Sequence, residues 1–202
     1  IVCVIGEAGL GKSRLLIETR EAWEAINLGV GPFGKIESRW NQANGISYES
    51  TRPYGLIQRL IRDFIGLTSS DSPEIVREAL VETLGMPGLE RSSEVHGLFE
   101  TILGVQEQKN GNELAGEDLK KAIYKELLTS LEILVQQGPA VIAVDDLHWA
   151  DETSVDLIIH LFQLADRFPI LFLCSFRPDR SSPAWKVRHY AASNHKEYFA
   201  EG

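Results

Sequence analysis

The sequence predicts an α/β fold in which a parallel sheet carries helices on both faces. Short, uninterrupted apolar runs at 1–5, 140–144 and 169–175 are typical of strands that are buried on both sides. Segments with the period of amphipathic helices lie between these runs, and strand–helix–strand order favours parallel pairing. With 202 residues, 44% of them hydrophobic, the chain is long enough to form one domain with a sizeable core.

The first part of the chain is expected to contain two strands and then a group of helices. Strand 1–5 is followed by a helix over 12–27. A second strand is predicted at 33–40, where the charged residues favour an edge of the sheet. Residues 41–116 are expected to form a helical insertion between the second and third strands. It contains three amphipathic segments that each end at a glycine, at 53–66, 72–85 and 92–104.

The second part alternates regularly between helices and strands, as expected of a parallel sheet. Its helices have apolar stripes, and its strands are apolar throughout. In chain order the expected elements are a helix at about 117–137, strand 140–144, a helix at about 152–166, strand 169–175 and a last short strand at 196–200.

Charge, apolar runs and cysteines limit the function classes. The net charge of −9 argues against nonspecific binding of nucleic acid, because neutralising phosphates needs a basic surface. No apolar run reaches the roughly 18 residues of a membrane span, and the chain opens on a strand without a secretory leader. Cys3 and Cys174 lie in apolar strands, where buried, reduced thiols are expected, and this favours a cytoplasmic location.

The segment GEAGLGKS, residues 6–13, matches the phosphate-binding loop pattern G-x-x-x-x-G-K-[ST]. It follows an apolar strand and opens an amphipathic helix, which is the context that the pattern requires. The glycines let backbone N–H groups surround a phosphate, the lysine can contact the β- and γ-phosphates, and the serine hydroxyl can bind Mg²⁺. The nucleotide-binding residues predicted here are Gly6, Glu7, Ala8, Gly9, Leu10, Gly11, Lys12, Ser13 and Arg14.

Two adjacent carboxylates, Asp145 and Asp146, directly follow another apolar run. In phosphate-loop proteins a neighbouring strand ends in an acidic residue that holds the Mg²⁺ shell, so Asp145 and Ser13 are the expected metal ligands. Asp146 is predicted to orient or deprotonate the attacking water, and its alternative role is to cap the following helix. Asp151 is the better cap candidate, because a helical pattern begins directly after it. His148 is expected to be a structural hydrogen-bonding residue.

Arg177 follows a further apolar strand in the segment LFLCSFRPD. Ligands of open parallel sheets bind at the carboxyl ends of the strands, so Ser175 and Arg177 are expected to point toward the phosphates. Arg177 can contact the γ-phosphate through charge-assisted hydrogen bonds and is predicted, with Lys12 and Asp146, to be catalytic. The alternative is a surface arginine that pairs with Asp179.

The three segments VIGEAGLGKSRLL, VIAVDDLHWAD and LFLCSFRPD together resemble the signal-transduction ATPases with numerous domains (the STAND class) within the AAA+ group. The likeness is greatest to the ATPase module of large bacterial LuxR-type transcription regulators and of proteins with adenylate or guanylate cyclase domains. The acidic pair followed by Leu-His-Trp-Ala-Asp is the most distinctive piece. The resemblance covers about 1–40 and 117–200.

The resemblance implies a three-layer P-loop NTPase fold with the sheet order 5-1-4-3-2, and ATP or ADP with Mg²⁺ as cofactors. It also implies attached effector domains, such as a winged helix, helical repeats, a helix-turn-helix or a cyclase, and it leaves a nucleotide-dependent homo-oligomer open. Family members carry a Gly-Arg segment before the first strand and a helical lid after the fifth. We therefore expect residues 1–202 to be an ATPase core truncated at both ends.

These features predict a regulatory module that hydrolyses ATP slowly, with Mg²⁺, and switches attached domains between ATP and ADP states. One alternative is an AAA+ motor or loader acting on DNA or protein, which the acidic charge disfavours. Another is a small-molecule kinase with Asp146 as the base, which the 133 positions between Lys12 and Asp145 (145 − 12) disfavour. A GTPase is disfavoured because the N-K-x-D guanine signature is absent. A degenerate nucleotide site that serves only as a scaffold is disfavoured because Lys12, Ser13 and both aspartates are present.

Overall fold

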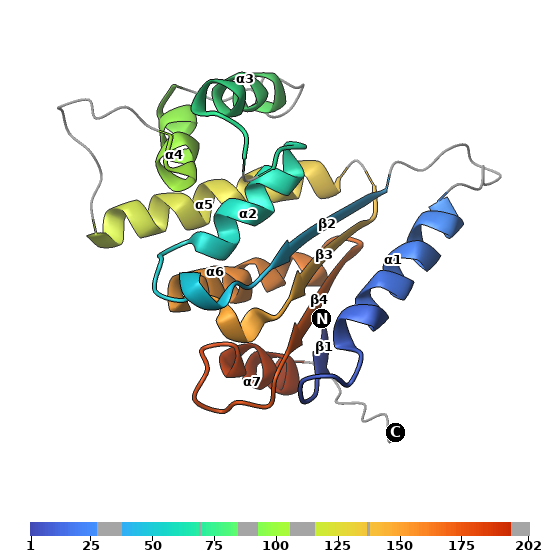
Figure 1. The fold of residues 1–202 in the computed structure, drawn as a ribbon. Helices are drawn as coiled ribbons and strands as arrows, with labels where there is room; N and C mark the ends of the chain where they lie inside the picture. The colour runs from blue at the N-terminus through green and yellow to red at the C-terminus, as the bar shows by residue number, and fades with distance from the viewer. Residues whose placement is uncertain (28–37, 69, 85–92, 106–115, 137, 195–202) are drawn as a thin grey trace.

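The computed structural model describes residues 1–27, 38–68, 70–84, 93–105, 116–136 and 138–194. Within them the chain forms an α/β fold around a parallel sheet in the order β1-β4-β3-β2 (Figure 1). The strands are β1 (Val2–Ile5), β2 (Arg39–Asn44), β3 (Ala140–Asp145) and β4 (Ile170–Phe176). The predicted fold class is confirmed, and the order is the predicted one without its fifth strand. That expected strand, 196–200, lies outside the described residues.

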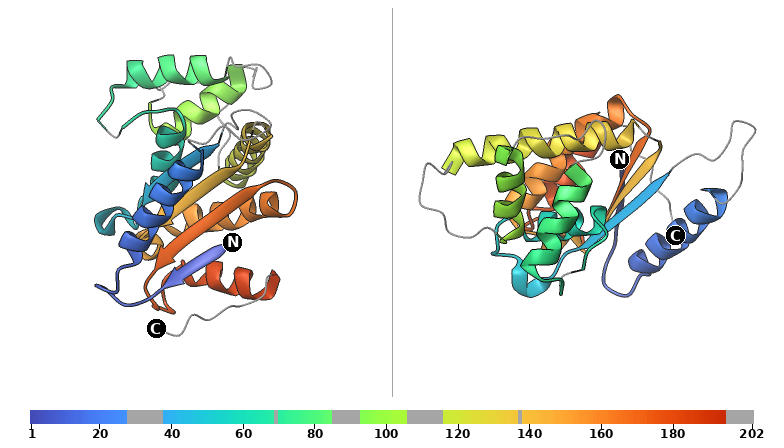
Figure 2. Two further views of the ribbon diagram at one scale, coloured as in Figure 1. Left: turned by 90° about the vertical axis from the view of Figure 1, so that its right-hand side faces the viewer. Right: turned by 90° about the horizontal axis from the view of Figure 1, so that it is seen from above.

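Helices cover both faces of the sheet, as predicted. Helix α1 lies on one face, and α5, α6 and α7 lie on the other, whereas α2 packs beside β2 and carries α3 and α4 farther out (Figures 1 and 2). The α-helices are α1 (Lys12–Asn27), α2 (Gly55–Phe64), α3 (Pro73–Leu84), α4 (Ser93–Leu103), α5 (Gly116–Val135), α6 (Glu152–Leu161) and α7 (Trp185–Asn194). Three short 3-10 helices are η1 (Ser47–Glu49), η2 (Leu147–Trp149) and η3 (Phe162–Asp166).

Strand β2 lies later in the chain than the predicted strand at 33–40, most of which falls outside the described residues. Its sequence, RWNQAN, is polar, and it forms a strand because all six residues pair with β3, from Arg39 opposite Ala140 to Asn44 opposite Asp145. The residues 41–44, counted with the helical insertion, therefore extend the sheet. Within the described part of the sheet β2 is an edge strand, in agreement with the charges that predicted an edge.

The predicted helices are present with small shifts at their ends. The three amphipathic segments of the insertion form α2, α3 and α4. Helix α6 ends at Leu161, earlier than expected, and continues as η3. Helix α7 was not predicted, because its sequence WKVRHYAASN has little amphipathic character. None of the described helices combines the length and the apolar character that a membrane span needs.

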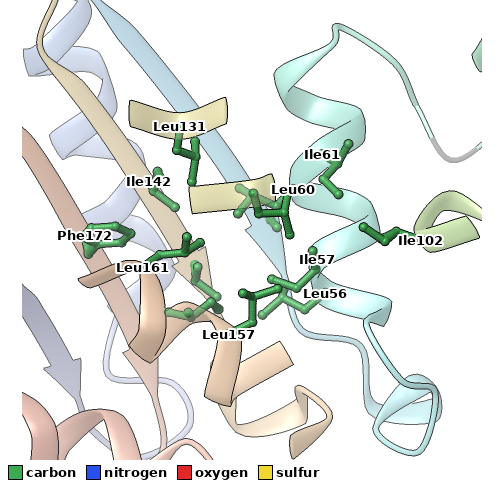
Figure 3. Packing of buried hydrophobic residues seen from close by; sticks show 14 of the residues in the cluster. Leu56, Ile57, Leu60, Ile61, Ile102, Leu131, Ile142, Leu157, Leu161 and Phe172 are labelled. Carbon is green, nitrogen blue, oxygen red and sulfur yellow. The ribbon is translucent and has the colours of Figure 1, made fainter. Parts of the chain in front are cut away.

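The core forms where α2, α5 and α6 meet over β3, which is buried along its whole length. Figure 3 shows Leu60 of α2, Leu131 of α5 and Leu161 of α6 approaching Ile142 of β3. Each is at most 4% exposed, and burying one such side chain stabilises the fold by about 1.5–3 kcal/mol. This packing fixes the position of β3, and the carboxyl end of β3 carries the acidic pair.

Cys3 and Cys174 are register partners on β1 and β4, and both are free thiols, as predicted. Burial raises the pKa of Cys3 to about 11 and also raises the pKa of Cys174. Both cysteines therefore act as small apolar residues of the sheet.

Candidate functional site

The predicted phosphate loop connects β1 to α1 and is open to solvent. Gly9 and Gly11 have φ angles of 83° and 81°, the left-handed region that glycine adopts without steric cost. Lys12 is only 9% exposed, and its Nζ donates to the carbonyl oxygen of Glu7 at 3.0 Å, so the side chain folds back over the loop. Of the other predicted nucleotide-binding residues, Gly6 is half-buried, and the exposed ones are Glu7, Ala8, Gly9, Leu10, Gly11, Ser13 and Arg14.

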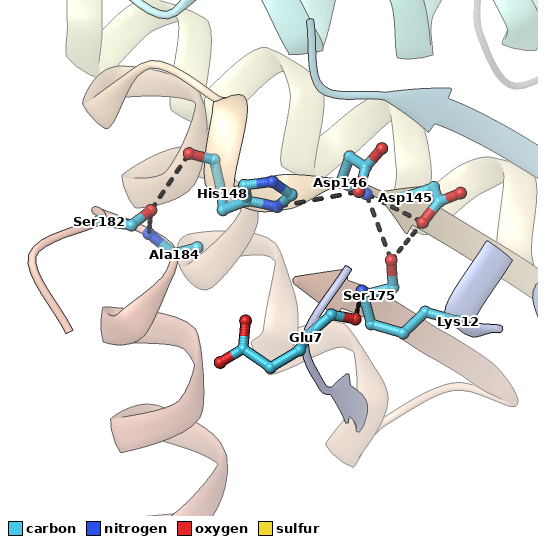
Figure 4. A network of polar contacts seen from close by, with 8 residues as sticks. All are labelled: Glu7, Lys12, Asp145, Asp146, His148, Ser175, Ser182 and Ala184. Atoms are coloured by element: carbon cyan, nitrogen blue, oxygen red, sulfur yellow. Dashed lines mark hydrogen bonds and ion pairs between the residues drawn. The ribbon is translucent and has the colours of Figure 1, made fainter. Parts of the chain in front are cut away.

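Asp145 lies at the end of β3, directly beside the end of β4. Its Oδ1 accepts a hydrogen bond from Ser175 Oγ and another from the backbone N–H of Asp146 at 2.9 Å. Asp145 is 7% exposed and Ser175 is fully buried. Figure 4 shows these groups near Lys12, whose bond to the Glu7 carbonyl is a separate contact. The sheet order thus brings the ends of β1, β4 and β3 together, although the residues come from three distant parts of the chain.

Asp146 turns its backbone out of the strand. Its φ and ψ of 50° and 39° are left-handed, and its side chain is 43% exposed. Its carboxylate caps no helix, whereas Asp151 caps α6 by accepting from the backbone N–H of Ser154 at 2.8 Å, as predicted. An open groove of about 870 Å³, lined by α1, β2 and α2, reaches Asp146 from solvent. The side chain is therefore accessible and is not engaged as a helix cap.

His148 is buried deeply against the acidic pair. Its side chain is 5% exposed, Nδ1 lies 3.8 Å from Asp146 Oδ1, and neither ring nitrogen has a hydrogen-bond partner. The sequence analysis expected the ring of His148 to form a structural hydrogen bond, and the ring forms none with the residues that the structure describes. Burial lowers the pKa of His148, the Asp146 charge raises it, and Arg177 and Lys12 lower it further. Burial, the largest of these effects, thus favours the neutral form of the His148 ring.

Arg177 follows β4 and lies over the ring of Trp149, with Cζ 5.7 Å from the ring centroid. Asp179, the alternative partner, instead accepts from the backbone N–H and the hydroxyl of Ser181 at 2.8 and 2.6 Å. No ion pair within 4.0 Å joins the described side chains of Arg177 and Asp179. The arginine is half-buried at the carboxyl edge of the sheet, on the same side as the loop.

Gly45 is a site residue that the sequence analysis missed. Its N–H donates to the Asp145 carbonyl at 2.8 Å, and a Cβ atom placed on Gly45 would lie 2.1 Å from the Asp146 carbonyl oxygen. Only glycine allows β2 and the Asp146 turn to approach so closely. The signal in the sequence was a glycine directly after the polar strand, but its partner is 101 positions away (146 − 45).

Tyr54 makes a second connection that the sequence did not reveal. It precedes α2 with a left-handed φ of 60°, and its backbone N–H donates to Asp151 Oδ1 at 3.0 Å. Asp151 also accepts from the hydroxyl and the backbone N–H of Ser154. One buried carboxylate therefore ties the helical insertion to the segment that carries Asp146.

The residues at this edge fit a magnesium-bound nucleotide. Among the described residues no group of three or more His, Cys, Asp or Glu side chains could hold a metal alone. Mg²⁺ bound with phosphates needs only one or two protein oxygens, and the hydroxyl of Ser13 and the carboxylate of Asp145 are such hard oxygen donors. The positive end of α1 and the left-handed loop suit a phosphate.

Comparisons with known proteins agree with this geometry. The family described as "AAA ATPase domain" matches residues 1–173. An uncharacterized protein of Rhizobium meliloti (strain 1021) is 32% identical over 187 residues, which cover 90% of this chain and 16% of the relative. The chain thus spans about a sixth of the length of that relative. No solved structure matches the chain.

Proposed function

The chain belongs to the AAA ATPase domain family, a family of nucleotide-binding ATPases, and on that premise we propose that it is the ATP-driven switch of a larger regulatory protein. It binds ATP with Mg²⁺ at the loop Gly6–Ser13, hydrolyses it slowly and passes the difference between the ATP and ADP states to attached domains. The length of the relative, of which this chain spans 16%, supports the presence of such domains.

The burial of Asp145 beside the phosphate loop carries this proposal. An ionised carboxylate that is 7% exposed is costly unless it is paired or binds a cation. Two donors, Ser175 Oγ and the Asp146 N–H, both approach the same oxygen, Oδ1. The polar edge formed by β1, β3 and β4 is therefore suited to a cation held between Asp145 and a phosphate.

Each side chain has a separate task in this proposal. Lys12, freed from the Glu7 carbonyl, contacts the β- and γ-phosphates, and the loop N–H groups surround them. Ser13 and Asp145 hold Mg²⁺, which neutralises phosphate charge when it is bound. Asp146, accessible from the groove, accepts a hydrogen bond from the attacking water and orients it. Arg177 contacts the γ-phosphate and so distinguishes ATP from ADP.

The helical insertion is the part of the chain that we propose relays the nucleotide state. Asp63 of α2 accepts from Asn41 Nδ2 at 2.9 Å and from the Gln42 N–H at 3.0 Å, so α2 is bound to the strand beside β3. Arg59 Nε donates to the Asn44 carbonyl at 2.9 Å. A displacement of the β2 and β3 ends on hydrolysis would thus move α2 and the helices packed on it.

Titration calorimetry of this chain with ATP, ADP and GTP, with and without Mg²⁺, tests the proposal. Lys12→Ala is expected to abolish adenine-nucleotide binding, whereas Lys121→Ala, at an exposed ion pair with Asp118 on α5, leaves it unchanged. Asp145→Asn is expected to remove the Mg²⁺ dependence while weak binding remains.

Two results would contradict the proposal. Equal affinities of the wild type and Lys12→Ala would show that the loop is not the site. Failure of the folded chain to bind any nucleotide, repeated with the chain extended at both ends, would show that the fold serves as a scaffold.

A further inference from the structure

A second cavity lies away from the phosphate loop, between α2, α3 and α5. It has a volume of about 270 Å³ and is partly enclosed. Twelve of its sixteen lining residues are apolar, and α2 and α5 each contribute four of the sixteen. Two of the lining residues, Leu60 of α2 and Leu131 of α5, are labelled in Figure 3. Neither Asp145 nor Asp146 lines this cavity.

Ser130 of α5 is the buried polar group of this cavity. It is 7% exposed and lines the cavity, and its hydroxyl has no hydrogen-bond partner among the residues that the structure describes. Other helix hydroxyls of this chain donate to the carbonyl four residues earlier: Thr129 to Lys125 at 2.8 Å and Thr19 to Leu15 at 2.7 Å. Burying an unsatisfied hydroxyl is costly, so its presence at the wall of an apolar cavity calls for a partner from outside the chain.

The volume of the cavity and the charges of its lining residues indicate what kind of molecule could bind there. An engineered apolar cavity of about 150 Å³ in another protein holds benzene, so by proportion this one holds roughly eleven non-hydrogen atoms. The charged lining residues are one cation and one anion, Arg39 and Glu82, and they give no preference for a charged ligand. Among the described lining residues, Ser130 is the one buried polar residue.

We propose that this cavity binds a small, neutral, mostly apolar molecule with one hydroxyl or carbonyl group, which forms a hydrogen bond with Ser130. The site is separate from the nucleotide site, and its occupation does not depend on ATP. Helix α2 forms one wall and is bonded to β2, and Arg39, the first residue of β2, also lines the cavity, so the ligand lies against the strand that pairs with β3.

Calorimetric titration of the nucleotide-free chain with 2-naphthol and with naphthalene tests this proposal. 2-Naphthol has the required size and one hydroxyl group, and naphthalene lacks that group. We expect 2-naphthol to bind with a Kd on the order of 10–100 µM. Ser130→Ala is expected to weaken 2-naphthol binding by about 3- to 10-fold and to leave naphthalene binding unchanged. Thr129→Ala, which removes the neighbouring hydroxyl outside the cavity, should change neither.

A cavity-filling variant decides whether the probe binds here. Ala79→Leu adds volume to the α3 wall and is expected to weaken both probes at least about 10-fold; if it does not fold, Thr83→Leu on the same wall replaces it. Absence of 2-naphthol binding below about 1 mM would overturn the proposal. So would an unchanged Kd in the filled variant, or an unchanged ratio of the two affinities in Ser130→Ala. Because no nucleotide is present, these results are independent of the Lys12→Ala test.

Discussion

Replacing Gly45 by alanine is expected to disturb the acidic pair without touching any carboxylate. The added Cβ would lie 2.1 Å from the Asp146 carbonyl oxygen, and real Cβ atoms essentially never approach another heavy atom within 3.0 Å. The Asp146 backbone and β2 must therefore separate by at least 0.9 Å (3.0 − 2.1 Å). The nearest atoms are the Asp146 backbone and the Trp149 Cβ, 3.2 Å away, neither of which is the far end of a flexible side chain that could move aside.

Two effects follow from that displacement. Overpacking of this kind costs about 1–3 kcal/mol, which lowers the Tm of a domain of this size by about 2–12 °C. A shift of about 1 Å in a group that positions a reacting atom costs about 100-fold in rate. Gly45→Ala is therefore expected to unfold earlier in a thermal melt and to hydrolyse ATP about 100-fold more slowly, while Lys12 and the loop still bind nucleotide.

Gly97→Ala is the matched control for this prediction. Gly97 lies within α4, and a Cβ there would meet nothing within 4 Å. The substitution is expected to stabilise the helix by about 0.5–1 kcal/mol and to leave hydrolysis unchanged. If Gly45→Ala behaves like Gly97→Ala in both assays, β2 and the Asp146 turn are not in close contact and the reasoning is refuted.

Three other changes test the packing around the site. Asp151→Ala removes the acceptor of three hydrogen bonds and is expected to lower the free energy of unfolding, measured by urea denaturation, by about 2–3 kcal/mol. The control Asp156→Ala removes an ion pair on the same helix and should lower it by less than about 1 kcal/mol. Because burial raises the pKa of Cys3 and Cys174, both should react with a disulfide reagent at neutral pH only after unfolding; rapid labelling of the folded chain would contradict this. Burial lowers the pKa of His148 in the folded chain, so protonation of this residue favours the unfolded chain. The free energy of unfolding should therefore decrease as the pH falls below about 6.5, and it should decrease less steeply in His148→Phe. Equal pH dependence of the two proteins would disprove the effect.

Local patterns were sufficient to predict the chemistry-bearing elements. The phosphate loop is contiguous, and its strand and helix have strong apolar patterns, so β1 and α1 could be placed correctly. The same holds for Asp145, because an apolar run that ends in an aspartate marks a strand end. The cap formed by Asp151 also follows from a few neighbouring residues.

Features that depend on distant pairing could not be predicted. The polar segment RWNQAN has no strand pattern of its own, and β3 makes it a strand by pairing with it. The close approach of Gly45, the burial of His148 and the bond from Tyr54 to Asp151 each join segments far apart in sequence or depend on such packing. A single sequence contains no direct record of which of its segments meet.

The position of β1 has a consequence for synthesis of the chain. Among the described strands β1 pairs only with β4, in a register that joins Val2 to Leu173, 171 positions later (173 − 2). At about 5–20 residues per second, roughly 9–34 s separate the translation of the two partners on the ribosome. During that interval β3 can already pair with β2, but the strand before the phosphate loop has no neighbour in the described sheet. A nascent chain that stops short of β4 should therefore be unable to retain ATP, although its phosphate-loop sequence is complete.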